Sequence, residues 1–223
     1  MHSPFKITIK LGSPICLTFP FLHLDGIVAY LDAIDKFGQK LFEFSRMEYL
    51  PELERPLPFK KTGMVYNASA AIFLPEAEMR FIRIYKRFED KYSDVLKKKK
   101  LRIGSGFFRS FAIAEPYIPA THVIFYGNGN VKRIKYLFEN YLIGIGNDIR
   151  IGFGAIRDII IENINNDYSL IKNGMAMRTI PIKMLKDYED TAYITYKQPY
   201  WYKTNATLCV APGMRCELNE KYI

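Results

Sequence analysis

The chain has 223 residues, of which 49% are hydrophobic and 25% charged, and this is the ordinary composition of a globular protein. Intrinsic disorder and collagen-like repeats are excluded. At this length folding buries roughly 70% of the surface of the unfolded chain, so the core needs no disulfide or metal to stabilise it.

Three cysteines, Cys16, Cys209 and Cys216, form an odd and sparse set, which indicates free thiols in a reducing compartment. The longest stretch without charged residues near the start, residues 11–24, contains two prolines and is too short to span a membrane. The pattern of a signal peptide is also missing. The sequence therefore predicts a cytoplasmic protein that has no membrane partner.

Most of the net charge of +9 lies in one segment. Residues 80–109 contain eleven Lys or Arg residues against three acidic residues, a local charge of +8, and the other 193 residues carry about +1. A basic surplus gathered in one segment is typical of a protein that binds a polyanion, most often nucleic acid. The alternative is a solvated charged helix or hairpin.

The first predicted elements are a strand and a helix. Residues 5–11 (FKITIKL) alternate between apolar and polar side chains, as in a half-buried strand. After a turn, an amphipathic pattern beginning at Asp25 predicts the first helix, which Gly38 is expected to interrupt or end. Its apolar face would comprise Ile27, Val28, Leu31, Ile34 and Leu41, and its polar face Asp32, Asp35 and Lys36.

The middle of the chain is expected to form a long basic finger. Residues 51–58 are rich in proline and suit a connection, and residues 64–74 suit a strand. Alternation on both sides of the lysines at 97–100 predicts a hairpin inserted at about residues 76–115, although a short helix over residues 89–96 also fits.

The second half supplies a strand over residues 122–126, a helix over 131–142, a glycine-rich loop over 144–154 and a strand over 155–162. Short strands and turns are expected after them. Without the finger, the order is strand, helix, strand, strand, helix, strand.

This order predicts an α+β fold with a ferredoxin-like, or RNA-recognition-motif-like, antiparallel sheet and two helices. The expected domains are residues 1–162, which include the basic hairpin as an insertion, and a β-rich C-terminal extension, residues 163–223, packed on the same domain. Such a fold serves many unrelated functions, so it does not by itself fix an activity.

The glycine-rich loop is the most distinctive motif. It reads GIGNDIRIGFG, with the spacing G-x-G-x5-G-x-G at Gly144, Gly146, Gly152 and Gly154. Glycines allow positive φ, so successive N–H groups can turn outward to hold a phosphate. A dinucleotide fingerprint and a Walker A motif both fail to fit. The alternative is a glycine-rich turn with a purely structural role.

The loop, placed between the second helix and the last strand of such a fold, resembles the signature of the RAMP superfamily of CRISPR proteins. The segment FLHLDGIVAYLDAI (residues 21–34) and the QPYW segment (residues 198–201) are similar to motifs of the Cas-five-like subunit of type IV CRISPR effector complexes.

This resemblance implies a non-enzymatic, RNA-binding subunit that caps the 5′ handle of the crRNA. The implied protein partners are a Cas-seven-like backbone subunit and the large subunit, and target DNA would be contacted indirectly. The implied RNA-binding residues lie in the loop, in the finger and near helix one: Gly144, Gly146, Arg150, Gly152, Phe153, Gly154, His23, Arg87, Lys97, Lys98, Lys99, Lys100, Arg102 and Arg109. The loop departs from the family pattern because Asn147 and Asp148 follow its second glycine, where members often carry Lys or Arg.

The aromatic residues of YITYKQPYWYK, residues 193–203, alternate with lysines and could stack on unpaired bases. About half of these rings are expected in the core. Trp201 is predicted to be a surface ring that contacts RNA.

Histidine and metal chemistry are the remaining questions. His23 could act as a general acid or base or stack on a base, or it could cap or orient the first helix beside Asp25. The three histidines and the spacing of Cys209 and Cys216 do not suit a metal site, so no metal or other cofactor is expected.

The alternative function is a metal-independent endoribonuclease that processes crRNA, since relatives in the superfamily cut RNA with His, Tyr or Lys. Its catalytic residues would be His23, Tyr30 and Lys36. Against it, the sequence offers no second histidine that clearly converges with His23.

Overall fold

The computed structural model describes residues 2–19, 21–42, 55–89, 104–106 and 108–222. Within these ranges the chain forms two α-helices, α1 (Leu24–Phe37) and α2 (Val131–Tyr141), and antiparallel pairs of mostly short strands. The strands are β1 (Ser3–Leu11), β2 (Ile15–Cys16), β3 (Lys61–Thr62), β4 (Val65–Tyr66), β5 (Ile72–Leu74), β6 (Arg80–Lys86), β7 (Phe111–Ile118), β8 (His122–Gly129), β9 (Ile156–Asn163), β10 (Ile171–Lys172), β11 (Met175–Ala176), β12 (Ile180–Pro181), β13 (Leu185–Tyr188), β14 (Ala192–Thr195), β15 (Ala206–Val210) and β16 (Cys216–Leu218). Short 3₁₀ turns are η1 (Gly38–Phe42), η5 (Ile149–Ile151), η6 (Ile182–Met184), η7 (Lys203–Asn205) and η8 (Glu220–Tyr222).

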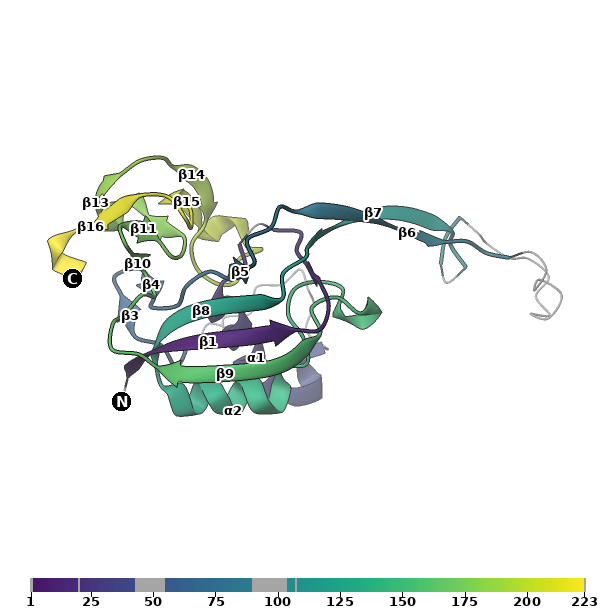
Figure 1. Cartoon of the computed structure of the whole chain (residues 1–223), viewed down its shortest axis with the longest axis horizontal. Helices are drawn as coiled ribbons and strands as arrows, with labels where there is room; N and C mark the ends of the chain where they lie inside the picture. Colours follow the sequence, from purple (N-terminus) through teal and green to yellow (C-terminus); the bar gives the residue numbers. More distant parts are fainter. Residues whose placement is uncertain (1, 20, 43–54, 90–103, 107, 223) are drawn as a thin grey trace.

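The central sheet has the order β5-β8-β1-β9, and each neighbouring pair is antiparallel. Both helices pack on one of its faces (Figure 1). Alternate residues of β1, namely Phe5, Ile7 and Ile9, are fully buried, which confirms the alternation predicted for residues 5–11. They share a core with Leu24, Val28 and Leu31 of α1 and with Ile134, Leu137 and Phe138 of α2.

The ends of both helices follow from local sequence. α1 ends at Phe37 because Gly38 adopts a φ of 54° and its N–H bonds to the Ile34 carbonyl, as the sequence predicted. α2 begins after Asn130, whose side chain accepts a hydrogen bond from the Arg133 N–H at 3.1 Å.

The polar face predicted for α1 needs one correction. Asp32 is 8% exposed, because its carboxylate accepts hydrogen bonds from Arg133 of α2 at 2.6 Å and from Arg55 at 3.2 Å. Arg133 also bonds to Asp35 at 2.6 Å. The face expected in solvent is therefore partly the contact between the two helices.

Two strand predictions are wrong. The strand predicted over residues 64–74 is broken into β4 and β5, because Ser69 and Ala70 donate their N–H groups to Tyr126 and Met177 in other segments. The alternation was expected to form a strand on each side of the lysines at 97–100, yet β7 begins only at Phe111 and the described residues between it and the lysines, 104–106 and 108–110, form no strand. The helix considered for residues 89–96 lies almost entirely outside the described residues.

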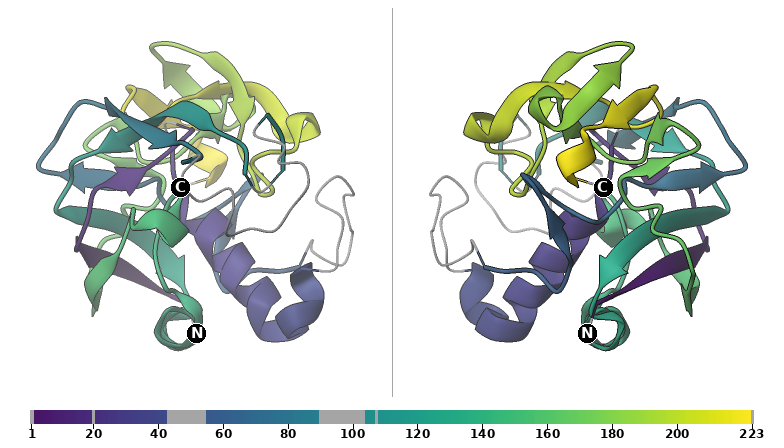
Figure 2. Two further views of the ribbon diagram at one scale, coloured as in Figure 1. Left: turned by 90° about the vertical axis from the view of Figure 1, so that its right-hand side faces the viewer. Right: turned by 90° about the vertical axis from the view of Figure 1, so that its left-hand side faces the viewer.

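The residues after β9 form a β-rich segment with a small core of its own. β12, β15 and β14 make one sheet, and β13 pairs with β16. Figure 2 shows this segment, green to yellow, at the top of the molecule above the sheet and helices. The buried residues of this core are Val65 of β4 together with Leu170, Ala176, Ile180, Met184, Leu185, Val210 and Cys216. None of the described helices is long and apolar enough to cross a membrane.

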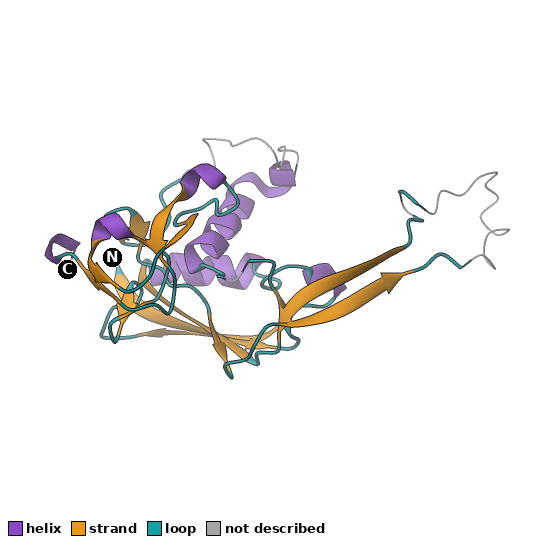
Figure 3. Ribbon diagram, turned by 90° about the horizontal axis from the view of Figure 1, so that it is seen from above, coloured by secondary structure: helices purple, strands orange, loops and turns teal. Residues whose placement is uncertain are grey.

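The basic finger is an antiparallel ribbon of β6 and β7, paired from Arg80↔Tyr117 to Lys86↔Phe111. It projects from the body of the molecule (Figure 3). Its base is held by β2, which pairs with β7 at Ile15↔Ile118 and Cys16↔Tyr117.

Candidate nucleic-acid interface

The described part of the finger is basic and solvent-exposed. Arg80 and Arg83 lie on β6, Arg87 just past its end and Arg109 just before β7, and all four are exposed. The remaining finger residues predicted to bind RNA, Lys97, Lys98, Lys99, Lys100 and Arg102, lie outside the described residues.

The glycine-rich loop lies beside the base of this finger. Asn147 donates its N–H to the Cys16 carbonyl of β2 at 2.8 Å, and Gly154 donates to the Pro14 carbonyl at 2.8 Å. The rings of Phe153 in the loop and Tyr117 in β7 are 6.4 Å apart. The structure thus brings together the loop and the finger, which the sequence had singled out separately.

Close packing explains why three of the four loop positions require glycine, because a side chain there would clash with neighbouring atoms. A Cβ on Gly154 would lie 1.8 Å from the Ile145 carbonyl oxygen, and one on Gly146 would lie 2.5 Å from the Cys16 carbonyl oxygen. One on Gly144 would meet the Ile149 side chain at 2.7 Å. Gly152 differs, because its Cβ would meet nothing within 4 Å and its φ of 103° is what favours glycine there.

Many of the loop's N–H groups are already occupied within the protein. Those of Ile145, Asn147, Ile151, Gly152, Phe153 and Gly154 donate to carbonyl oxygens. This differs from the expected row of donors that turns outward to hold a phosphate. Arg150, which is exposed on η5, is the group that the loop presents to an anion, and Phe153 is half-buried.

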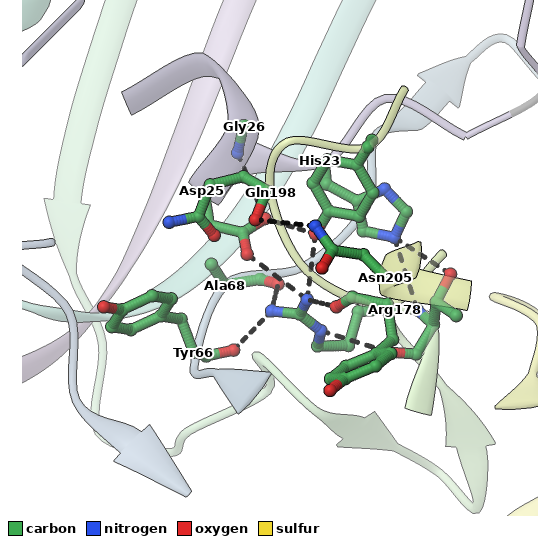
Figure 4. Close-up of polar contacts among 11 residues, drawn as sticks. His23, Asp25, Gly26, Tyr66, Ala68, Arg178, Gln198 and Asn205 are labelled. Atoms are coloured by element: carbon green, nitrogen blue, oxygen red, sulfur yellow. Dashed lines mark hydrogen bonds and ion pairs between the residues drawn. The ribbon is translucent and has the colours of Figure 1, made fainter. Parts of the chain in front are cut away.

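The two segments that carried the resemblance, residues 21–34 and 198–201, meet inside the protein around Arg178 (Figure 4). Arg178 is fully buried and donates to Asp25 at 3.3 Å and to the Tyr200 hydroxyl at 2.9 Å. Tyr200 in turn donates to Asp25 at 2.7 Å. Gly26 makes room for this contact, since a Cβ there would come within 3.2 Å of the Tyr200 ring.

The remaining donors of Arg178 bond to backbone carbonyls of Tyr66, Ala68, Thr179 and Tyr196. Burial alone would lower the pKa of Arg178, but the electrostatic interactions and hydrogen bonds with Asp25 and Tyr200 together outweigh it and raise that pKa. Arg178 therefore stays charged, and its cluster joins α1, the segment around β4 and the C-terminal extension.

His23 belongs to the same interior cluster. It is 4% exposed, its Nε2 lies 3.1 Å from the Thr179 hydroxyl, and its ring stacks on Tyr200 with centroids 4.3 Å apart. Burial, together with the positive charge of Arg178, holds the pKa of His23 well below its usual range. This placement disagrees with a role in contacting RNA, and the side chain does not cap α1 although the residue occupies the N-cap position.

The other residues of the nuclease hypothesis lie on the outside of α1. Tyr30 is exposed at a largely apolar groove of about 440 Å³ between α1 and the glycine-rich loop. Lys36 is exposed with its Nζ 5.0 Å from the centre of the Phe37 ring. Six helical residues place Lys36 roughly 120° around the helix from Tyr30, so the two side chains do not converge.

Trp201 is 60% exposed, which confirms it as a surface ring, while its contact with RNA stays a prediction. Tyr193 is also exposed, whereas Tyr196 and Tyr200 are partly buried. Two of the five rings are thus exposed and three are partly buried, and none is fully buried as about half were expected to be.

One polar cluster was not anticipated from the sequence. The Cys16 sulfur lies 3.8 Å from a carboxylate oxygen of Glu115 of β7 and 3.8 Å from one of Asp148 of the loop, so its single S–H has two acceptors within reach. The sulfur and the two oxygens lie within 4.8 Å of one another. Burial, reinforced by the two carboxylates, raises the pKa of Cys16 to about 11. Since the thiolate is the form that ligates metals, this thiol serves as a hydrogen-bond donor. Cys16 is separated in sequence by 99 residues from Glu115 and by 132 from Asp148, so no short motif could predict this cluster.

Comparison with solved structures finds distant relatives. The chain is similar to a chain of the Csm3-Csm4 subcomplex in the type III-A CRISPR-Cas interference complex, with a TM-score of 0.45 and 11% identity over 96% of this chain and 93% of that chain. It is also similar to a chain in the cryo-EM structure of the type III-B Cmr-beta complex bound to cognate target RNA, with a TM-score of 0.41, 12% identity and 73% of this chain covered. This chain spans 61% of the length of that relative. No curated protein matches it.

A family model does match almost the whole chain. Residues 3–212 match the model described as CRISPR type IV associated protein Csf3. The matched range runs from β1 into the C-terminal extension and includes the buried cluster around Arg178, the finger and the glycine-rich loop. This confirms the resemblance that the sequence motifs indicated, and the chain belongs to the family of CRISPR type IV associated protein Csf3.

Proposed function

We propose that this chain is a non-catalytic, RNA-binding subunit of a type IV CRISPR effector complex that caps the 5′ handle of the crRNA. The observation that carries the proposal is the basic finger. It projects into solvent, exposes Arg80, Arg83 and Arg87, and belongs to a segment with a net charge of +8. Such a segment suits the phosphate backbone of RNA, because each neutralised phosphate releases counterions.

The proposal includes a ferredoxin-like interpretation of the central domain. Without the finger, the main elements follow the order β1, α1, β5, β8, α2, β9, and the sheet order is β5-β8-β1-β9. This is the β-α-β-β-α-β pattern. Residues 1–162 would form this domain, with residues 163–223 as an extension packed on it.

The absence of catalysis is part of the proposal, and the position of His23 supports it. A general acid or base must reach the proton that it transfers, and the His23 ring is enclosed by Thr179 and Tyr200. Tyr30 and Lys36 point in different directions from α1. We further expect a Cas-seven-like backbone subunit and the large subunit as protein partners, with target DNA contacted indirectly.

The experiment that tests the proposal is purification of the complete complex with its co-transcribed partners, followed by sequencing of the bound RNA. We expect a short RNA with one defined 5′ end. A complex assembled without this chain should lose protection of that 5′ end against an exonuclease. A discrete 5′ end that is equally protected without this chain would contradict the capping function.

A matched pair of variants tests the finger. Replacing Lys97, Lys98, Lys99 and Lys100 by alanine should weaken RNA binding evenly across sequences and lower the salt slope by roughly one for each phosphate that the finger no longer neutralises. The control replaces exposed lysines outside the finger, Lys40, Lys60, Lys132 and Lys183, and removes the same charge. An equal decrease in affinity for both variants would mean that total charge alone, and not the finger, attracts the RNA.

Variants of the nuclease candidates complete the test. Tyr30→Phe and Lys36→Ala should leave the length and 5′ end of the bound RNA unchanged. Accumulation of unprocessed precursor RNA with either variant would instead support the endoribonuclease alternative.

A further inference from the structure

The register of the finger divides it into two chemically different faces. Directly paired residues of an antiparallel ribbon project to the same side. Phe81, Arg83 and Tyr85 of β6 therefore share one side, which we call the aromatic face. Their partners on β7 are small or compact: Phe81 pairs with Pro116, Arg83 with Ala114 and Tyr85 with Ala112.

Both rings of the aromatic face are open to solvent. Phe81 is 68% exposed and Tyr85 is 67% exposed. The alanines opposite them are too short to cover a ring. Among the described residues, neither ring stacks on another aromatic side chain. Two large rings left uncovered on a projecting ribbon indicate a surface with a binding role.

The opposite side of the ribbon has a different character. Its β6 residues are Arg80, Ile82, Ile84 and Lys86, and their partners on β7 are Tyr117, Glu115, Ile113 and Phe111. Glu115 bonds to Cys16, and Tyr117 lies beside Phe153 of the glycine-rich loop. At its base this aliphatic side contacts the body and carries the carboxylate of Glu115, and its cations, Arg80 and Lys86, lie at opposite ends with Ile82 and Ile84 between them. It therefore lacks the alternation of exposed ring and cation that the aromatic face has.

We propose that the aromatic face binds single-stranded RNA by stacking unpaired bases on Phe81 and Tyr85, with Arg83 between them neutralising phosphate. The proposal rests on the proposed function and assigns the contact to one face of the finger. The three β6 residues and their three partners include no acidic side chain. A strand rise of about 3.3 Å per residue sets the two rings about 13 Å apart, so they hold separate bases.

Single-stranded RNA fits this combination better than an RNA duplex does. Aromatic rings alternating with a cation suit bases that have a free face and a phosphate between them. In a duplex the bases are already stacked and paired, so these rings would have nothing to bind.

The test measures binding of a single-stranded RNA of about ten nucleotides by the full chain. The RNA carries a 2-aminopurine base, whose fluorescence falls when it stacks. The double variant Phe81→Ala/Tyr85→Ala removes both rings. The matched control, Ile82→Ala/Ile113→Ala, removes exposed apolar side chains from the opposite face of the same ribbon. A Phe81→Trp/Tyr85→Phe variant keeps two rings.

We expect the double alanine variant to lose about tenfold in affinity for each ring and to lose the fluorescence quenching. The aliphatic control and the ring-preserving variant should bind and quench like the original chain. A blunt RNA duplex should bind all variants equally.

Other outcomes overturn the proposal in distinguishable ways. If the original chain binds the RNA and the double alanine variant binds and quenches equally well, the face assignment is wrong while the proposed function stands. The same holds if the aliphatic control loses as much affinity as the double alanine variant. If the original chain does not bind single-stranded RNA and the complex carries no RNA, both proposals fail together.

Discussion

At the scale of single residues, the buried ion pair between Asp25 and Arg178 is expected to make the stability of the fold sensitive to the loss of the arginine. Both side chains are fully buried, so removing the arginine would leave an uncompensated carboxylate together with carbonyls of Tyr66, Ala68 and Tyr196 that no longer have this donor. We expect Arg178→Met to lower the free energy of unfolding by about 3 to 5 kcal/mol, measured by urea denaturation.

Two further variants test the reason for that destabilisation. Adding Asp25→Asn to Arg178→Met should restore part of the stability, because the orphaned charge is gone. Lys186→Met breaks an exposed ion pair with Glu217 and should cost no more than about 1 kcal/mol. A similarly small effect of Arg178→Met would show that the buried pair contributes little.

His23 makes stability depend on pH in a defined window. Its folded-state pKa lies well below the value of 6.5, so between these two values the unfolded chain binds a proton that the folded chain does not. The free energy of unfolding therefore decreases as pH falls below about 6.5, by up to about 1.4 kcal/mol per pH unit. Denaturation at several pH values between 7.5 and 5 measures this slope. His23→Gln should reduce this slope. The control His122→Gln, which lies outside the cluster, should leave the slope unchanged. An unchanged slope in His23→Gln would mean that another group causes the pH dependence.

At the scale of elements, the glycine-rich loop contains two glycines, Gly152 and Gly154, whose replacement by alanine should cost different amounts of stability. Gly152 and Gly154 both have positive φ, but a Cβ on Gly154 would clash with the Ile145 carbonyl whereas one on Gly152 would enter open space. Gly152→Ala should cost about 1 to 2 kcal/mol from backbone strain alone. Gly154→Ala should cost on the order of 1 to 3 kcal/mol more because the loop must shift. Thermal unfolding of the two variants measures the difference, and equal destabilisation would contradict the packing explanation.

The regular elements could be predicted because their signals are local. Alternation over residues 5–11 and the apolar spacing of residues 131–142 depend on one face packing against a core, and Gly38 can end a helix by its own φ. The break between β4 and β5 could not be predicted, because the N–H groups of Ser69 and Ala70 bond to residues more than fifty positions away. Asp32 was misplaced for the same reason, since its partners are Arg55 and Arg133.

The charge of the candidate interface could be predicted from the sequence, whereas most of its contacts could not. The basic surplus and the exposed ring of Trp201 are visible in composition and spacing. Arg178 carried no signal, since one arginine among apolar residues resembles a surface position until its partners are known. The motifs around Asp25 and Tyr200 drew attention as sequence features, yet their contacts show a structural role that joins two parts of the chain.

At the scale of the whole molecule, two hydrophobic cores share one polar junction. The first core lies between the central sheet and its two helices, and the second is formed by the C-terminal extension together with Val65 of β4. Arg178 comes from the extension, and its partner Asp25 comes from α1, whose residues Leu24, Val28 and Leu31 belong to the first core. The junction is therefore positioned to make the two cores fold as one cooperative unit.

The single tryptophan allows this cooperativity to be measured. Trp201 lies in the extension, so its fluorescence reports on that segment, whereas far-ultraviolet circular dichroism is weighted toward the sheet and helices. We expect the two signals to change at the same urea concentration in the original chain, as in a two-state transition. Arg178→Met should separate the two midpoints, with the extension unfolding first because its core is smaller. Arg133→Met breaks the ion pairs between α1 and α2, the two helices that cover the first core, and should shift both midpoints together. Separate midpoints in the original chain would show instead that the extension is an independent domain and that the buried junction does not couple it to the sheet.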